Sequence, residues 1–545
     1  MSRTTIPEGD ERGEVRMPDD GQGIGSDGGL RRAVSWITVT IAAGAGVLLA
    51  VGAFLGLYVR PTSDDWCALW KARDMGVLGI TADFYRTQNG RVTNAFLTGL
   101  IYTDDMRGPK LLPAFLVVAL GAGLFLLGRA ALRALRPAHA PDPHEPDPHA
   151  SGPGPTSGPA ARPPVVLLAA AAALLSALLF FAGTRSYQVL LWAPATISHT
   201  LPSVIGLWAV LAAVRAARSG RRWARSAAVG SVLLAGTALG MLSEPFALVA
   251  GVFAATAGLL CLPRLGWTRD RYVSTWCAAA CLGLAVGLVL LTTSPGARWR
   301  RAQHPKEPLS FPLLGETFRD WWHVWETIGG QWAYAGAAAI GVLLGLGLSR
   351  ATPGTAPTTG RGPRGRRGLP SGLPPRRLFR IVVLLPLPLI ALASLGVTYG
   401  LRSGYGDVGW TYGRTWTSFL LPLLLALCAY GTWGGYRLGL LLRAAGRPAA
   451  RAAALVAVGA IAVGSTAALV RPVYALTTDT VVRGVAWDRQ NARIRAEVAA
   501  GAREVAYGPL LIGQLTEPLF APTYERDWAA QCTARYYGVE RIHRP

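Results

Sequence analysis

The sequence predicts an all-α polytopic membrane protein with about eleven transmembrane helices and a small α/β unit at its C-terminal end. The chain has 545 residues, of which 51% are hydrophobic. It contains many long apolar runs, and residues 34–59 carry no charge over 26 positions. Because an α-helix needs only about 20 apolar residues to cross the hydrocarbon core, so many runs are expected only in a chain that lies in a bilayer.

The expected spans cover residues 34–59, 111–128, 164–184, 201–216, 226–242, 246–262, 275–293, 333–349, 379–398, 417–431 and 451–470. Eleven is an odd number, so the two ends of the chain are expected on opposite sides of the membrane. The first run has no small-residue cleavage site behind it and is interpreted as a retained helix.

Arginine density in the loops predicts the orientation. Arginine-rich loops occur near residues 31–32, 129–136, 215–225, 264–271, 350–380 and 437–451, and they alternate with arginine-poor loops near 185–200, 243–245 and 399–416. Cytoplasmic loops carry an excess of basic residues, so the N-terminus is predicted to be cytoplasmic and the C-terminus extracytoplasmic, in a plasma (inner) membrane. The formal net charge of +23 then reflects topology and contact with membrane lipid, not a nucleic-acid partner.

The chain divides into a membrane domain, residues 31–470, and flanking segments. Residues 1–30, 137–163 and 351–375 are rich in Gly, Pro or Asp and are predicted to be disordered on the cytoplasmic side. Ordered outer loops are expected at 60–110 and 294–332. The tail, 471–545, predicts a helix over 479–501, a strand over 504–507, a helix over 528–537 and a strand over 539–542. Function is expected on this outer face, where ordered loops stand on a scaffold.

Two adjacent carboxylates, Asp64 and Asp65, follow the first span. One interpretation is N-capping, with Ser63 or Asp64 at the start of a loop helix. The other is an active site, because a carboxylate pair can bind a divalent metal ion or take a proton from a hydroxyl. The sequence leaves both open and assigns no cofactor.

Polar residues on two other outer segments are candidate ligands for an anion. Asn89 begins a predicted turn, and Arg91 after it is either a surface arginine or a bidentate phosphate ligand. Glu244 lies in a break between two short spans. An acid near membrane depth is costly unless it is paired or faces water, so Glu244 is a functional candidate.

Arg301, Asp407 and Arg414 are further candidates, because they carry charge on a side that is otherwise poor in arginine. A lipid headgroup or a diphosphate is a suitable partner for these arginines. Four tryptophans recur at helical spacing before the span at 333–349, and they predict an interfacial helix: Trp321, Trp322, Trp325 and Trp332. The histidines lack metal-ligand spacing, so they predict no zinc site.

Cys67 and Cys532 are the two cysteines expected on the oxidising outer side, and they predict a disulfide. The other four cysteines fall in expected spans. The predicted bond would hold the tail over Asp64 and Asp65 as a lid.

Short motifs along nearly the whole chain resemble a known class. They are Asp64-Asp65-Trp66, Asn89-Gly90-Arg91, Ser294-Pro295-Gly296 with Arg301, and Trp528 followed by Tyr536-Tyr537-Gly538. With the many spans and the outer tail, they resemble the GT-C class of membrane glycosyltransferases, and more closely a bacterial family of unknown function related to that class. The chain departs from that family at Ala297, where Asn is usual, and it lacks a second Asp-x-Asp motif.

The resemblance implies a glycosyltransferase that moves a sugar from a polyprenyl-phosphate donor to a glycan or protein acceptor of the cell envelope. Asp64 or Asp65 would be the base, and Arg91, Arg301 and Arg414 would stabilise the departing phosphate. A transporter or flippase for a lipid-linked saccharide is an alternative, although the spans have few polar groups. A non-catalytic assembly protein is another. An enzyme requires these acids and arginines to converge, whereas a scaffold does not.

Overall fold

The computed structural model describes residues 24–134, 165–262, 270–303, 310–350, 383–512, 515–516, 524 and 527–545. The segments 1–23, 137–163 and 351–375, expected to be disordered, lie outside these residues. Helix α1 begins at Ile24, so the last residues of the expected N-terminal tail are helical.

Helices make up most of the described chain. They are α1 (Ile24–Leu55), α2 (Asp64–Thr87), α3 (Val92–Tyr102), α4 (Arg107–Ala134), α5 (Val165–Phe181), α6 (Ala193–Ala195), α7 (Leu201–Ser219), α8 (Arg222–Gly240), α9 (Glu244–Leu260), α10 (Arg271–Thr293), α11 (Pro295–Gln303), α12 (Phe311–Gly330), α13 (Ala335–Arg350), α15 (Pro386–Tyr405), α16 (Thr417–Ala444), α17 (Pro448–Ala468), α18 (Val470–Ala499) and α19 (Trp528–Tyr537). Short 3₁₀ or π segments are η1 (Gly56–Tyr58), η2 (Tyr187–Leu191), η3 (Thr196–Thr200), η5 (Trp332–Tyr334), η6 (Gly406–Thr411) and η7 (Gly413–Trp416).

Seven helical stretches of the described chain are long and apolar enough to cross a membrane: Arg32–Tyr58, Arg107–Ala134, Ala193–Ser219, Arg271–Thr293, Trp332–Ser349, Gly413–Ala444 and Pro448–Ala499. All the expected spans fall at least partly on helices. Four of them, on α5, α8, α9 and α15, are outside this group of seven. The chain is therefore an all-α polytopic membrane protein.

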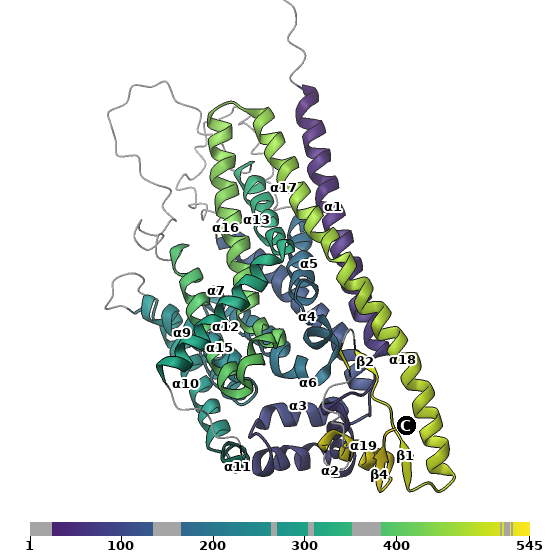
Figure 1. Ribbon diagram of the computed structural model, residues 1–545. Helices are drawn as coiled ribbons and strands as arrows, with labels where there is room; N and C mark the ends of the chain where they lie inside the picture. Colours follow the sequence, from purple (N-terminus) through teal and green to yellow (C-terminus); the bar gives the residue numbers. More distant parts are fainter. Residues whose placement is uncertain are drawn as a thin grey trace, which may run out of the picture.

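The helices form a bundle with most of the loop helices at one end (Figure 1). Helices α1 and α18 run side by side along one edge, and α18 continues beyond the end of α1. Helices α2, α3, α11 and α19 lie together at the end opposite the start of α1. This end carries the charged residues described below.

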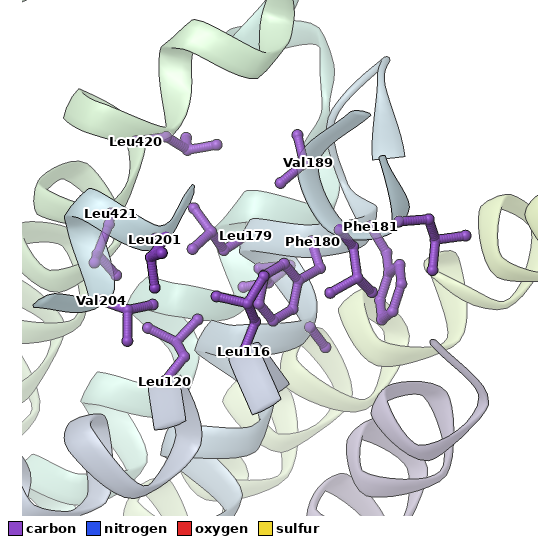
Figure 2. Close-up of a cluster of buried hydrophobic side chains, with 14 of the residues drawn as sticks. Leu116, Leu120, Leu179, Phe180, Phe181, Val189, Leu201, Val204, Leu420 and Leu421 are labelled. Carbon is purple, nitrogen blue, oxygen red and sulfur yellow. The ribbon is translucent and has the colours of Figure 1, made fainter. Parts of the chain in front are cut away.

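The core of the bundle is built around α5, a helix of Ala, Leu, Val and Phe with one serine, in which Phe180 and Phe181 are fully buried. Figure 2 shows side chains from four other segments packed around its end: Leu116 and Leu120 of α4, Val189 of η2, Leu201 and Val204 of α7, and Leu420 and Leu421 of α16. Burial of these side chains fixes the helix ends that carry the polar residues.

Close helix packing elsewhere depends on small residues. Helices α13 and α16 meet at glycines, and a Cβ on Gly435 would lie 2.3 Å from the carbonyl oxygen of Val342. Glycine lets helix backbones approach closely, which is a common means of association between membrane helices.

The C-terminal residues pack against the start of α2. Strands β1 (Glu504–Ala506) and β4 (Arg541–His543) pair in parallel, and β2 (Leu511–Ile512) pairs antiparallel with β3 (Leu515–Thr516). Cys67 of α2 is bonded to Cys532 of α19, with an S–S distance of 1.95 Å, so the two cysteines expected to pair do so. Trp66 is fully buried, and its ring contacts four aromatic rings of this region: Trp487, Tyr507, Tyr536 and Tyr537.

Candidate functional site

A strained turn places the two adjacent acids at the start of α2. The amide of Asp65 donates to the carbonyl oxygen of Thr62 at 2.9 Å, which closes the turn. Ser63 within it has φ 53° and ψ −117°, a conformation that is unfavourable for a residue with a Cβ. The Ser63 side chain makes no cap hydrogen bond, and Asp64 is already the first helical residue. Capping by either residue therefore does not account for the acid pair.

Asp65 points into the protein. It is 1% exposed, it accepts a hydrogen bond from the Tyr102 hydroxyl, and its Oδ2 accepts one from the Thr62 amide at 2.9 Å. Burial raises the pKa of Asp65 to about 7, although both hydrogen bonds act in the opposite direction. Because its oxygens are occupied by α3 and by the turn, Asp65 holds the start of α2 in place.

Asp64 has a different environment. Its side chain is exposed, yet the surrounding protein raises its pKa by desolvation. Three guanidinium groups act against this shift and lower the pKa of Asp64: Arg414 first, then Arg300 and Arg91. These arginines come from η7, α11 and the residue before α3. A carboxylate at one end of the bundle thus lies near three cations from distant parts of the sequence.

Arg91 is held by Glu244, the first residue of α9. The Arg91 Nη2 lies 2.8 Å from Glu244 Oε2, and Nε lies 3.4 Å from Oε1, a bidentate arrangement. The side chain of Asn89 accepts a hydrogen bond from the Arg91 amide at 3.0 Å, so Asn89 shapes the turn that presents Arg91. Arg91 and Glu244, both predicted from the sequence, are therefore direct partners.

Two glycines allow the start of α11 to pack closely against the turn before α3. Gly90 has φ +75°, and a Cβ there would lie 2.0 Å from Ser294 Oγ. A Cβ on Gly296 would lie 2.8 Å from the amide nitrogen of Gln88. The short motifs around Gly90 and Gly296 thus pack backbone against backbone, and this contact places Arg300 near Asp64.

Arg414 is oriented by two residues of the segment after α5 and by its own neighbour Tyr412. Its Nη1 donates to Gln188 Oε1 at 3.1 Å, and its guanidinium lies over the rings of Trp192 and Tyr412, at 5.2 and 4.8 Å from their centroids. His199 of the π segment η3 lies within electrostatic range of Arg414 and Arg91. π-Helical turns are frequent at functional sites.

Sequence reasoning missed four of these residues: Gln188, Trp192, His199 and Arg300. The first three occur in the arginine-poor segment between two expected spans, where the presence of polar side chains was an available signal. Three arginines occur within four residues there, so the sequence did not indicate that Arg300, and not Arg298 or Arg301, would lie near Asp64.

Two predicted residues are not brought to Asp64. Arg301 donates to the carbonyl oxygen of Thr292 at 2.7 Å and is not among the three arginines that act on Asp64. Asp407 is exposed on η6 and has no hydrogen bond or ion pair within the described part of the chain. Of the predicted interfacial tryptophans, Trp322 and Trp332 are exposed. Trp321 and Trp325 instead donate to Ser394 of α15 at 2.9 and 3.2 Å.

We call this group of five charged residues the Asp64 cluster: Asp64, Arg91, Glu244, Arg300 and Arg414. With three cations and two anions it has a positive formal charge, which suits an anionic ligand beside a carboxylate that can accept a proton. Among the described residues, no group of three or more His, Cys, Asp or Glu side chains could hold a metal ion. Asp64 and Asp65 themselves diverge.

The fold and this site define a polytopic helical membrane protein with a charged cluster at one end of its helix bundle. Comparison with known proteins gives no closer placement: no family model matches the sequence, and neither a curated protein nor a solved structure is significantly similar to it.

Proposed function

We propose that this chain is a GT-C-like membrane glycosyltransferase that moves a sugar from a polyprenyl-phosphate donor to a cell-envelope acceptor. The observation that carries the proposal is the position of Asp64 among the guanidinium groups of Arg91, Arg300 and Arg414. Glycosyl transfer from a lipid phosphate needs a base for the acceptor and cations for the leaving group. The Asp64 cluster contains both a carboxylate that can act as the base and arginines that can stabilise the leaving group.

In the proposed reaction, a hydroxyl oxygen of the acceptor forms a bond to the anomeric carbon while the bond from that carbon to the phosphate oxygen breaks. The electron pair of the broken bond leaves with the lipid phosphate, whose negative charge the arginines stabilise. Asp64 takes the proton of the acceptor hydroxyl. A single displacement of this kind inverts the anomeric centre. Asp65, bound by Tyr102, is a positioning residue and not the base.

The proposal includes a topology with eleven crossings, in which α5, α8, α9 and α15 also span the membrane. The Asp64 cluster then lies on the outer side, together with a C-terminal extracytoplasmic α/β unit. Two features support this orientation. Arginine-rich loops alternate with arginine-poor ones along the sequence. The disulfide between Cys67 and Cys532 is of a type that persists in oxidising compartments.

The test is a mass-spectrometric comparison of envelope glycans and polyprenyl-phosphate sugars in cells with and without the gene. We expect loss of one glycan substituent together with accumulation of one lipid-phosphate sugar, because the donor is no longer consumed. Unchanged glycans and unchanged lipid-linked sugars would contradict glycosyl transfer. Accumulation of the acceptor's unmodified form would identify the acceptor.

A further inference from the structure

An apolar groove of about 580 Å³ lies between α9, α12 and α15. The residues that line it include Leu248, Val252, Leu314, Phe318, Leu392 and Tyr399. Several of these large side chains are exposed along the groove, and Phe318 and Leu392 are 55% and 60% exposed. Exposed apolar side chains of this kind, next to helices that enter a membrane, mark a surface that an apolar ligand or a lipid covers.

The groove continues from the Asp64 cluster. Glu244, Leu248 and Val252 are spaced by four residues on α9, so they lie on one face of that helix. Glu244 at the first turn pairs with Arg91, and the two apolar residues below it line the groove. The helix face that begins in the charged cluster therefore ends in the apolar groove.

Helix α15 makes the same connection from the opposite wall. Tyr405 at its end lies within electrostatic range of both Arg91 and Arg414. Tyr399 and Leu392, one and a half turns or more before it, line the groove. Two helices thus run from the charged cluster into the groove.

Ion pairs fix the third wall, α12, close to the charged end. Arg402 of α15 binds both Glu316 and Asp320 of α12, with Nη1 3.2 Å from Asp320 Oδ2. Leu314, Thr317 and Phe318, on the same stretch of α12, face the groove. Ion pairs between charged residues that do not line the groove therefore hold α12 against α15.

We propose that this groove binds the aliphatic chain of a lipid phosphate whose anionic head lies in the Asp64 cluster. The inference rests on the proposed function for the chemistry of the head, but the binding itself requires no transfer. Continuity of the groove with three arginines favours a ligand that is apolar over most of its length and anionic at one end. Bulk bilayer lipid would fill the groove without any requirement for that head.

The test uses a polyprenyl phosphate with a photoreactive diazirine on its chain and the full-length protein in lipid nanodiscs. We expect crosslinks in the peptides of α9, α12 and α15. An excess of unlabelled polyprenyl phosphate should compete, and the corresponding polyprenol, which lacks the phosphate, should compete at least tenfold less well. Labelling spread evenly over other lipid-facing helices, with no competition, would mean bulk lipid only and would overturn the inference.

Matched variants make the test specific. Leu392→Trp narrows the groove. Val118→Trp is the control, because it places the same ring on α4 at a residue that is 69% exposed and does not line the groove. We expect Leu392→Trp to lose at least tenfold in competed labelling and Val118→Trp to retain it. Val252→Trp serves as a second groove variant if the first does not fold. Full labelling in a folded groove variant would overturn the proposal.

The two proposals fail separately. Competed labelling in the groove together with unchanged envelope glycans upholds the lipid-chain site and contradicts glycosyl transfer. A glycan that depends on the gene, together with labelling outside the groove, upholds the transfer and overturns the site.

Discussion

Asp64 and Asp65 are adjacent in sequence, yet their carboxyl groups lie in different environments. At the start of a helix, successive side chains point about 100° apart, so one carboxyl turns inward and the other outward. Asp65 meets Tyr102 and the Thr62 amide, and Asp64 meets the guanidinium groups. The environment of each carboxyl, and not its position in the motif, favours Asp64 over Asp65 as the proposed base.

The buried acid predicts a pH dependence of stability. The pKa of Asp65 rises from 3.8 to about 7 in the folded protein, so between these values the folded state binds more protons than the unfolded state. Stability should therefore fall as pH rises from 4 to 7, by up to about 4 kcal/mol from this group. Asp65→Asn should flatten that part of the profile in thermal unfolding of the detergent-solubilised protein. An unchanged slope would show that Asp65 does not titrate there.

Arg300 and Arg301 offer a matched pair of substitutions. Arg300 acts on Asp64, whereas Arg301 is bonded to the Thr292 carbonyl. We expect Arg300→Gln to weaken binding of a polyprenyl phosphate about tenfold, because a charged contact to phosphate is lost. Arg301→Gln should change the dissociation constant less than threefold. Equal losses in the two variants would remove Arg300 from the phosphate site.

At this scale the sequence was most informative about isolated charges. Glu244 and Arg414 were predicted because each is a charge where the surroundings carry few, and Arg91 was predicted because it follows a turn and its guanidinium can bind phosphate. Asp407 met the same criterion but lies exposed on η6. The polar side chains around Trp192 and Gln188 were a general signal of function. Their specific contact with Arg414 could not be predicted, because it depends on how the segment after α5 folds back, which no local pattern records.

Among the elements, the contact of α11 with the turn before α3 assembles the cluster. It requires two glycines, Gly90 and Gly296, at points where the backbones meet. The sequence motifs that contain them were visible, but their mutual contact is a property of the tertiary fold. Single-sequence patterns predict helices and turns, and they do not say which turn meets which helix.

Gly90→Ala should destabilise the protein strongly for two reasons. The alanine Cβ would overlap Ser294 Oγ, and the alanine backbone would have to adopt a φ of +75°. Gly446→Ala is the control, since Gly446 has φ +61° and open space around it. We expect about 1 kcal/mol for the control, from backbone strain alone, and more than about 3 kcal/mol for Gly90→Ala. Thermal unfolding measures both. Similar losses of stability in the two variants would mean that Ser294 can move aside at little energetic cost.

Helix α12 illustrates how far amphipathic spacing can be used. The helix was predicted from its tryptophans, and the structure has it at Phe311–Gly330. Its tryptophans divide between an exposed face and a face bonded to Ser394 of α15. Aromatic spacing predicted the helix, but the Ser394 partner lies 69 residues or more away along the chain and left no local signal.

Over the whole molecule, the C-terminal segment clamps the turn that carries Asp64. Arg483 of α18 donates to the carbonyl oxygens of Arg60 and Pro61, at 3.2 and 2.7 Å, just before the strained Ser63. Arg60 pairs with Asp488, and the disulfide joins α2 to α19. The C-terminal segment thus meets the residues that follow α1 at the candidate site, and the sequence predicted this contact only through Cys67 and Cys532.

Loss of the disulfide should loosen this clamp. We expect Cys67→Ser or reductant to lower stability by about 2–4 kcal/mol and to expose the C-terminal segment to protease, because a cross-link over 465 residues is removed. Limited proteolysis with and without reductant measures this. Cys428→Ser, which affects a free cysteine in α16, is the control. Equal protease resistance after reduction would mean that the noncovalent contacts hold the segment alone.

The most direct test of the central claim, that Asp64 works as a base among arginines, is complementation of a strain that lacks the gene. Envelope glycans and lipid-phosphate sugars are measured by mass spectrometry for wild type, Asp64→Asn and Asp74→Asn, the last affecting an exposed acid of the same helix that pairs with its neighbour Arg73. We expect Asp74→Asn to restore the glycan, and Asp64→Asn, produced at the same level, to fail to restore it. Full restoration by Asp64→Asn would contradict the proposed role of Asp64 as a base.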